Sequence, residues 1–165
     1  MKKIAIFCGS ISDKLIMQSA VEILNQFNIG YKSYIISAHR LPDILSKTIK
    51  KSMEEGIELI IAGAGLSAHL PGFIASKTIL PVIGVPIYNK KNGLLGGIDA
   101  LFSIVQMPKN VPVATVGINN SYNAGLLAIH ILSIKYKDIR KLLIKFRINE
   151  KEKLESEIDK NNYEE

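Results

Sequence analysis

Short apolar runs alternate along this chain with segments in which apolar residues recur every three or four positions. Runs of the first kind are typical of buried strands, and the second spacing is typical of helices with one apolar face. We expect five strands, at residues 4–8, 31–37, 58–62, 81–87 and 112–118. We expect helices over about 13–27, 42–55, 95–107 and 124–134, and one long charged helix from Lys137 onward.

Strands that alternate with helices predict an α/β protein with a mostly parallel, right-handed sheet between two layers of helices. The simplest arrangement of five such units is a three-layer, flavodoxin-like (Rossmann-like) sheet with the strand order 2-1-3-4-5. In this order strand 1 lies between strands 2 and 3. The turns after these three strands therefore converge on one crevice, where open parallel sheets bind their ligands.

The composition favours one soluble domain. With 165 residues, 47% of them apolar, the chain can form one compact core. We expect a single domain over residues 1–158 and an acidic, frayed tail over 159–165.

Cys8 is the only cysteine, which excludes an internal disulfide, argues against a cysteine-based metal site and fits a reducing cytoplasm. The first apolar run breaks at Gly9 and Ser10, too early for a signal peptide, and no run reaches membrane-spanning length.

The net charge of +6 raises the question of a nucleic-acid partner. Much of the basic excess lies between Lys135 and Lys145 on the late helix, where glutamate and lysine soon alternate. Aromatic residues that could stack on bases do not interleave with these charges. We therefore predict a solvated helix face and no nucleic-acid partner. A basic surface can still favour the capture of small anions.

The turn after the first strand, Gly9-Ser10-Ile11-Ser12-Asp13, opens a helix. The free N–H groups and the positive dipole end of such a helix form a site for an anion, and glycine allows a phosphate to approach the backbone closely. An alternative is that Ser12 or Asp13 simply caps the helix, and both interpretations can hold together. The spaced Gly-Lys-Ser/Thr of an ATP-binding loop is missing.

The turn after the second strand carries Ser37-Ala38-His39-Arg40-Leu41-Pro42, and Pro42 suits the first turn of the following helix. A titratable imidazole and a permanent guanidinium are thus adjacent at a strand end. The alternative for the pair alone is a histidine held against its own backbone and an arginine in solvent.

The third strand leads into Gly63-Ala64-Gly65-Leu66-Ser67-Ala68-His69-Leu70-Pro71-Gly72. This segment formally matches the dinucleotide fingerprint, but it follows the third strand, and the acidic residue expected about 20 positions later is absent. We favour glycines that let a small flat ligand lie against the backbone, with His69 as a second imidazole at the same rim. His130, among leucines and isoleucines at helical spacing, is expected to be a packed or surface residue.

These residues resemble the class I PurE family, the N5-carboxyaminoimidazole ribonucleotide mutases of purine biosynthesis. The shared motifs follow one another over nearly the whole chain: Gly9-Ser10-x-Ser12-Asp13, Ser37-Ala38-His39-Arg40-x-Pro42-Asp43, Gly63-Ala64-Gly65, Ala68-His69-Leu70-Pro71-Gly72, Ser103-Ile104-Val105-Gln106-Met107-Pro108 and Asn123-Ala124-Gly125-Leu126-Leu127-Ala128.

The resemblance implies a homo-octamer, no metal or organic cofactor, and transfer of a carboxylate from the exocyclic nitrogen of an imidazole ribonucleotide to the adjacent ring carbon. It implies that His39 is the general acid and base. Ser10, Asp13 and Arg40 would hold the phosphoribosyl group beside Gly9, assisted by Ser12 and Ser37. The backbone of Ala64 and Gly65, with His69 and Leu70, would form the carboxylate pocket.

Three features depart from the bacterial members of the family. Leu66-Ser67 replace smaller residues, the 87–96 loop is about three residues longer, and the 119–122 segment is about two shorter. The related class II enzymes carboxylate aminoimidazole ribonucleotide directly with CO2. They have lysine in place of Arg40 and lack the His-Leu-Pro-Gly run, so this chain resembles the mutases more closely. The remaining alternative is a non-catalytic nucleotide-binding module of flavodoxin-like fold.

Overall fold

The computed structural model describes residues 2–90, 93 and 95–162. Two compact units make up the chain, Met1–Ala128 and Ile129–Glu165. The first unit contains the whole sheet, and each unit is described by itself below. The domain bounds expected from the sequence, 1–158 and 159–165, stay a prediction.

The first unit is built on one parallel sheet of five strands in the order β2-β1-β3-β4-β5. The strands are β1 (Lys2–Cys8), β2 (Gly30–Ile35), β3 (Leu59–Gly65), β4 (Val82–Ile87) and β5 (Ala114–Thr115). This is the strand order predicted from the sequence. It places β1 between β2 and β3, so the carboxyl ends of these three strands lie at one edge.

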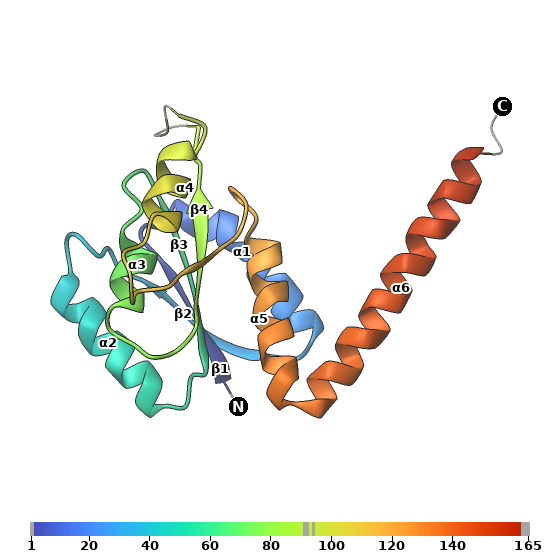
Figure 1. Ribbon diagram of the computed structural model, residues 1–165, viewed down its shortest axis with the longest axis horizontal. Coiled ribbons are helices and arrows are strands. Elements are labelled where there is room, and N and C mark those ends of the chain that lie inside the picture. The colour runs from blue at the N-terminus through green and yellow to red at the C-terminus, as the bar shows by residue number, and fades with distance from the viewer. Residues whose placement is uncertain (1, 91–92, 94, 163–165) are drawn as a thin grey trace. The chain divides into compact units, whose positions relative to one another are not determined.

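Helices cover both faces of this sheet. They are α1 (Asp13–Gln26), α2 (Pro42–Glu54), α3 (Leu70–Ala75), α4 (Ile98–Val105) and α5 (Ser121–Lys135), of which α5 begins in the first unit. Helices α2, α3 and α4 lie on one face, and α1 with the first part of α5 lies on the other (Figure 1). The three layers expected for an α/β protein are therefore present.

Alternate strand residues form the two cores. Ala5 and Phe7 of β1 belong to a buried cluster with Leu45 of α2, Ile74 of α3 and Ile104 of α4. Toward the other helices, the fully buried side chains include Ile4, Ile6, Met17, Ile23 and Leu24. Because successive strand residues point to opposite faces, one apolar run supplies both layers.

Five elements differ clearly from the sequence-based prediction. Strand β2 ends two residues earlier than expected, while β3 continues three residues further, through Gly63-Ala64-Gly65. Helix α4 is shorter than the predicted 95–107, because Gly96 and Gly97 have left-handed backbone angles and it can begin only after them. The expected strand at 112–118 pairs regularly at just two residues, and helix α3 was not predicted.

Helices α1 and α5 approach each other closely at Gly125. A Cβ built on Gly125 would lie 3.0 Å from the backbone oxygen of Ala20 and would overlap the Ile23 side chain. The start of α5 is tied to α1 by a hydrogen bond from the Ser121 hydroxyl to the backbone oxygen of Ile16. Glycine at 125 is thus required by the packing of these helices.

We expect Gly125→Ala to lower the thermal stability of the protein. Overpacking of this kind costs about 1–3 kcal/mol, which exceeds the roughly 0.8–1 kcal/mol that alanine gains over glycine inside a helix. At about 2–4 °C per kcal/mol for a chain of this size, the melting temperature should fall by several degrees in a calorimetric scan. The matched control is Gly117→Ala, where the new Cβ would meet nothing closer than 3.7 Å. An unchanged melting temperature for Gly125→Ala would contradict the packing argument.

Cys8 ends strand β1 and is only 4% exposed. Burial raises the pKa of its thiol to about 12, the nearby Asp13 charge adds to the rise, and Lys14 opposes it. At neutral pH the side chain is therefore a protonated, buried thiol that packs as a small apolar group.

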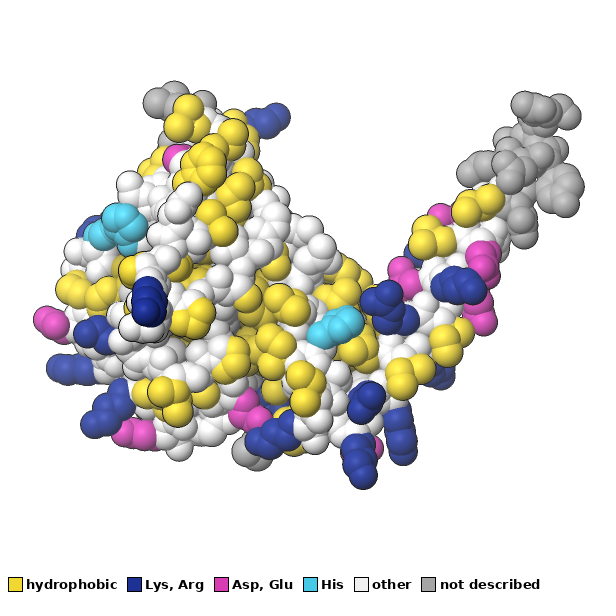
Figure 2. All heavy atoms as spheres, in the orientation of Figure 1, with side chains coloured by type: hydrophobic (Ala, Val, Ile, Leu, Met, Phe, Trp, Pro, Cys, Tyr) yellow, Lys and Arg dark blue, Asp and Glu magenta, His cyan; other side chains and the backbone are white. Residues whose placement is uncertain are grey.

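The second unit contains the end of α5 and the long helix α6 (Lys137–Asn162). Basic and acidic side chains are interspersed along α6 (Figure 2), as predicted from the charge pattern. Apolar side chains are also exposed there: Leu142, Ile144, Ile148, Leu154 and Ile158. Helix α6 continues through Asn162, and residues 163–165 of the predicted tail lie outside the described residues. None of the described helices has the length and hydropathy needed to cross a bilayer.

Candidate active site

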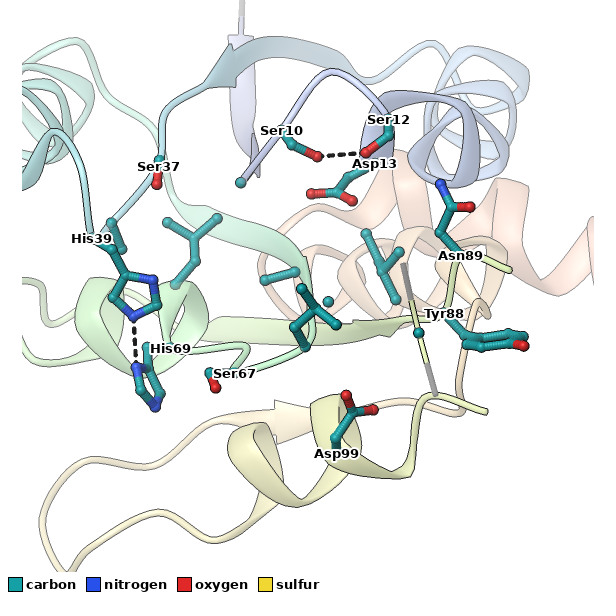
Figure 3. Close-up of a pocket in the computed structure, with 18 of the residues that line it drawn as sticks. Ser10, Ser12, Asp13, Ser37, His39, Ser67, His69, Tyr88, Asn89 and Asp99 are labelled. Carbon is teal, nitrogen blue, oxygen red and sulfur yellow. Dashed lines mark hydrogen bonds between the residues drawn. The ribbon is translucent and has the colours of Figure 1, made fainter. Parts of the chain in front are cut away.

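A cavity of about 390 Å³ opens at the carboxyl edge of the sheet. Its walls come from the turns after β1, β2, β3 and β4 and from the start of α4 (Figure 3). Every residue singled out from the sequence as a site residue lines this cavity: Gly9, Ser10, Ser12, Asp13, Ser37, His39, Arg40, Ala64, Gly65, His69 and Leu70. The three turns that were expected to converge do so, within one compact unit.

The turn after β1 presents hydroxyl groups to the cavity. The Ser10 and Ser12 hydroxyl oxygens are 2.8 Å apart and hydrogen-bonded. Ser12 is the N-cap residue of α1, but its backbone is already helical (φ −62°, ψ −29°) and its side chain makes no capping hydrogen bond. An N-cap side chain reaches back to the helix from an extended backbone, so the alternative in which Ser12 caps the helix is wrong. The amino end of α1 instead faces the cavity with its hydroxyls and N–H groups, an arrangement suited to an anion.

Asp13, the first residue of α1, is a buried carboxylate in this wall, with 7% exposure. Burial raises the pKa of its carboxyl group, and hydrogen bonds from the hydroxyl and backbone N–H of Ser10 partly oppose the rise. The ionised form is thus held in place at some cost to the fold. A charge retained at such a cost within a cavity is typical of a binding site.

We expect Asp13→Asn to stabilise the fold at neutral pH while weakening ligand binding. The folded pKa lies above the ordinary value of 3.8, so folding favours the neutral carboxyl. No cost exists below the unfolded pKa; the cost grows as the pH rises through the folded pKa and is complete once the pH lies above it. In calorimetry, Asp13→Asn should melt at a higher temperature than the wild type at pH 7, and this gain should shrink toward acid pH.

The exposed Asp43 of α2 provides the control for this substitution. Asp43→Asn should produce no comparable gain in melting temperature. A gain for Asp13→Asn that stays constant from pH 7 down to the acid range would show that the buried charge is not its cause.

The turn after β2 fixes His39 and Arg40 at the cavity. The backbone N–H of Leu41 donates to the Ser37 carbonyl at 2.9 Å, which closes the turn around the two residues. Pro42 then starts α2, where its fixed φ fits the first helical position. Both His39 and Arg40 are exposed to the solvent that fills the cavity. A proton-transfer group and a permanent cation therefore face the same space.

The two imidazoles of the cavity are hydrogen-bonded to each other. Nε2 of His39 lies 2.7 Å from Nδ1 of His69, and the rings meet edge to face with centroids 4.9 Å apart (Figure 3). The sequence identified both residues, but nothing in their spacing indicated that they pair.

The glycine segment at the end of β3 forms a wall of backbone. Gly65 pairs with Ile87 of β4, and a Cβ on Gly65 would lie 2.8 Å from the Ile87 carbonyl oxygen. The strand therefore extends past its predicted end because glycine permits this close pairing. Leu66 follows with a left-handed backbone (φ 55°) and a side chain that is 50% exposed.

The opposite wall was not identified from the sequence. It consists of Tyr88, Asn89 and Gly93 from the loop after β4 and Asp99 from α4. The side chain of Asn119 accepts a hydrogen bond from the Tyr88 N–H at 2.7 Å and donates one to the Tyr88 carbonyl at 3.0 Å. The position of this loop at the carboxyl end of a fourth parallel strand was the signal that could have identified it. Lys91, Asn92 and Leu94 of the same loop lie outside the described residues.

In the described part of the chain, no three histidine, cysteine, aspartate or glutamate side chains lie together in a group that could hold a metal ion. The chemistry that the cavity offers comes from one anion-binding turn, one guanidinium, a paired imidazole and a wall of backbone. Such a set can bind a phosphorylated small molecule and transfer a proton to or from it.

Comparison with protein families identifies the class of protein to which this chain belongs. A family model described as AIR carboxylase matches residues 3–153, and the chain therefore belongs to the AIR carboxylase family. The chain is similar to the N5-carboxyaminoimidazole ribonucleotide mutase of Aquifex aeolicus, with 55% identity over 140 residues that cover 85% of this chain and 82% of the relative. Identity to the mutase of the same name from Thermotoga maritima is 54% over 147 residues, 89% of this chain and 84% of the relative.

A second group of relatives has a different name and a different length. The phosphoribosylaminoimidazole carboxylase of Candida glabrata is 46% identical over 151 residues, which cover 92% of this chain but 26% of the relative. Among solved structures, the crystal structure of Treponema denticola PurE superposes with a TM-score of 0.85 and 26% identity, with complete coverage of both chains.

Proposed function

We propose that this protein converts N5-carboxyaminoimidazole ribonucleotide into 4-carboxy-5-aminoimidazole ribonucleotide, an isomerisation in the purine (IMP) biosynthetic pathway. The observation that carries this proposal is the single cavity in which the anion-binding turn, the glycine wall and the His39 imidazole meet. The mutases of Aquifex and Thermotoga, more than half identical to the chain over most of its length, support the same reaction.

In the proposed complex the phosphoribosyl group lies against the turn after β1. Ser10 and Asp13 hold it together with the guanidinium of Arg40, and the hydroxyls of Ser12 and Ser37 assist. The backbone at Gly9 allows the phosphate to approach the start of α1. Arginine suits this role because its planar, permanently charged fork matches phosphate oxygens.

The imidazole ring of the substrate would then lie between His39 and the backbone of Ala64 and Gly65. His69 and Leu70 border the space for the migrating carboxylate. The rigid glycine wall supports a flat ligand at close range, because no side chain intervenes there.

The reaction needs one proton delivered and one removed. As the bond between the exocyclic nitrogen and the carboxylate carbon breaks, CO2 leaves and the nitrogen takes a proton. CO2 then adds to the adjacent ring carbon, which loses its own proton. His39 can deliver the first proton and accept the second, and general acid and base catalysis of this kind contributes about 10²- to 10⁴-fold. Retention of CO2 beside the ring carbon adds a proximity effect, and neither step requires a metal or an organic cofactor.

A specific observation favours a second candidate, direct carboxylation of aminoimidazole ribonucleotide by CO2. The family model carries a carboxylase description, as do relatives from yeasts and a plant. These carboxylases are 44–46% identical, and the chain spans only 26–28% of their length. The mutases are 52–55% identical and are spanned over 82–90% of their length, which favours the mutase.

The deciding experiment supplies the purified protein with one of two starting materials. The first is N5-carboxyaminoimidazole ribonucleotide, and the second is aminoimidazole ribonucleotide with bicarbonate. Product is followed by its ultraviolet absorbance. We expect faster product formation from the carbamate; faster formation from the uncarboxylated nucleotide at modest bicarbonate would assign the protein as a carboxylase.

We further propose that the enzyme is a cytoplasmic homo-octamer. Exposed apolar residues on α4, among them Ile98, Phe102 and Val105, are 50–56% exposed and support association between copies. Analytical ultracentrifugation should find a species of about 146 kDa, eight times the 18.2-kDa chain. A monomer at micromolar concentration would refute the octamer.

A further inference from the structure

The hydrogen bond between His39 and His69 leaves a single ring nitrogen of His39 for a ligand. Its Nε2 is engaged by His69 at 2.7 Å, while the other nitrogen, Nδ1, is on the side of the ring that faces the cavity (Figure 3). Any proton that His39 exchanges with a bound molecule must therefore pass through Nδ1.

Both rings are held by short, closed segments of backbone. The Ser37 to Leu41 hydrogen bond encloses His39. His69 is the N-cap residue of α3; its N–H donates to the Ser67 carbonyl at 2.8 Å, and its carbonyl accepts from Phe73 at 2.9 Å. Leu70, 2% exposed, anchors the same segment in the core. These hydrogen bonds fix the backbone from which each ring extends, and from these two positions the ring nitrogens reach each other at 2.7 Å.

The direction of the hydrogen bond follows from the proposed chemistry. When His39 carries two protons it has no acceptor atom, so Nδ1 of His69 must accept from the Nε2–H of His39. When His39 has given up one proton and must act as a base, its Nδ1 has to be bare, which again leaves the proton on Nε2. A single tautomer of His69, with its own proton on Nε2, therefore fits both protonation states of His39.

We propose that His69 is a positioning residue that keeps the Nε2 proton of His39 in place, so that only Nδ1 of His39 gains and loses a proton during turnover. This inference rests on the proposed function. In the forward direction, the Nδ1 proton passes to the exocyclic nitrogen as the nitrogen–carbon bond breaks. After the new carbon–carbon bond forms, the ring-carbon proton returns to Nδ1, so the proton balance is zero and His69 keeps its proton throughout.

Within the described part of the chain, His69 is the sole hydrogen-bond partner of the His39 ring, where many catalytic histidines have a carboxylate. The charged groups that share the cavity wall are Asp13, Arg40 and Asp99. A neutral acceptor such as His69 orients the His39 ring without adding a negative charge beside the anionic substrate.

The kinetic test compares two substitutions of His69. His69→Phe keeps a planar ring but removes the acceptor, and we expect kcat to fall about 10- to 100-fold with KM within about threefold, a loss typical of a misoriented catalytic histidine or ligand. His69→Asn places an amide oxygen near the position of Nδ1 and should restore most of kcat. The third histidine of the chain does not line the cavity, so His130→Phe is the matched control and should leave both constants unchanged.

Several outcomes would overturn the proposal. Wild-type kcat in His69→Phe would do so, and equal losses in His69→Phe and His69→Asn with a raised KM would assign His69 to the wall of the pocket alone. Because His69 is exposed, circular dichroism and a melting curve should find all variants folded.

Neutron diffraction on the wild-type protein tests the pairing without any turnover. We expect deuterium on Nε2 of His39 and none on Nδ1 of His69; the reverse arrangement would contradict the proposal even if the enzyme is an active mutase. If neither ribonucleotide is converted, the proposed function fails, and the deuterium positions still decide whether His69 is the acceptor.

Discussion

His39→Asn will abolish turnover and leave nucleotide binding nearly intact. The amide side chain cannot exchange a proton near neutral pH. The protein therefore loses the rate enhancement of about 10²- to 10⁴-fold that a general acid and base contributes. The proposed phosphate contacts involve the turn after β1 and Arg40, which are other side chains of the cavity, and should persist. Steady-state kinetics and titration calorimetry with the product nucleotide measure the two effects separately.

The same experiment separates an enzyme from a nucleotide-binding module. His130→Asn, a histidine substitution outside the cavity, should behave as the wild type. If His39→Asn retains full turnover, His39 is not the proton-transfer group; if the wild type binds the nucleotide but converts nothing, the binding module is the better description.

Replacement of Arg40 by methionine will weaken binding of the ribonucleotide by about 10- to 100-fold. A charge-assisted hydrogen bond contributes about 1.5–3 kcal/mol, and Arg40 is the guanidinium in the cavity wall. We expect KM to rise by this factor while kcat at saturating substrate changes little, because the phosphate that Arg40 is proposed to bind is remote from the bonds that break. Lysine at this position should restore only part of the affinity, since it offers no bidentate fork.

A comparison with the riboside, which lacks the phosphate, identifies what Arg40 binds. Calorimetric affinities of the wild type and Arg40→Met should differ for the ribonucleotide and agree for the riboside. Equal losses for both ligands would mean that Arg40 does not hold the phosphate. Lys47→Met, which removes an exposed cation from α2 outside the cavity, controls for the general electrostatic attraction of the surface.

The strand order could be predicted because the apolar runs and helical periods of this chain are long and regular. Strand β5 shows where that reasoning fails. The run at 112–118 is apolar and lies alongside β4. The backbone N–H of Val116 donates to the Gly84 carbonyl, and that of Asn119 donates to the Pro86 carbonyl. It lies at the edge of the sheet with one neighbour, Pro112 has no N–H to donate, and Asn119 has a left-handed backbone. Regular pairing therefore survives only at Ala114–Thr115.

Helix α3 could not be predicted from periodicity for a different reason. Its six residues, Leu70–Ala75, are fewer than two turns, and Pro71-Gly72 is a pair that also marks loops. Proline is nevertheless accepted in the first turn of a helix, and buried Leu70 and Ile74 hold the segment against the sheet. Packing against the core, which a local pattern does not contain, determines this element.

The candidate site was predicted where backbone requirements leave a mark in the sequence. Gly9, Gly65 and Pro42 each indicate a turn or a close approach, and the side chains beside them could be identified. Tyr88 and Asp99 could not, because a polar loop and the first turn of a helix are common on any surface. The pairing of His39 with His69 depends on two turns that the sequence separates by 30 residues and only the fold brings within 2.7 Å.

Cys8 has a practical consequence. Maleimide reagents attack thiolates that they can reach, and this thiol, with a pKa of about 12 and 4% exposure, will be inert to them in the folded protein. A single new cysteine at the cavity rim would thus accept a fluorophore alone, with no background labelling and no need for a cysteine-free parent. Ligand entry could then be followed optically in the otherwise native chain.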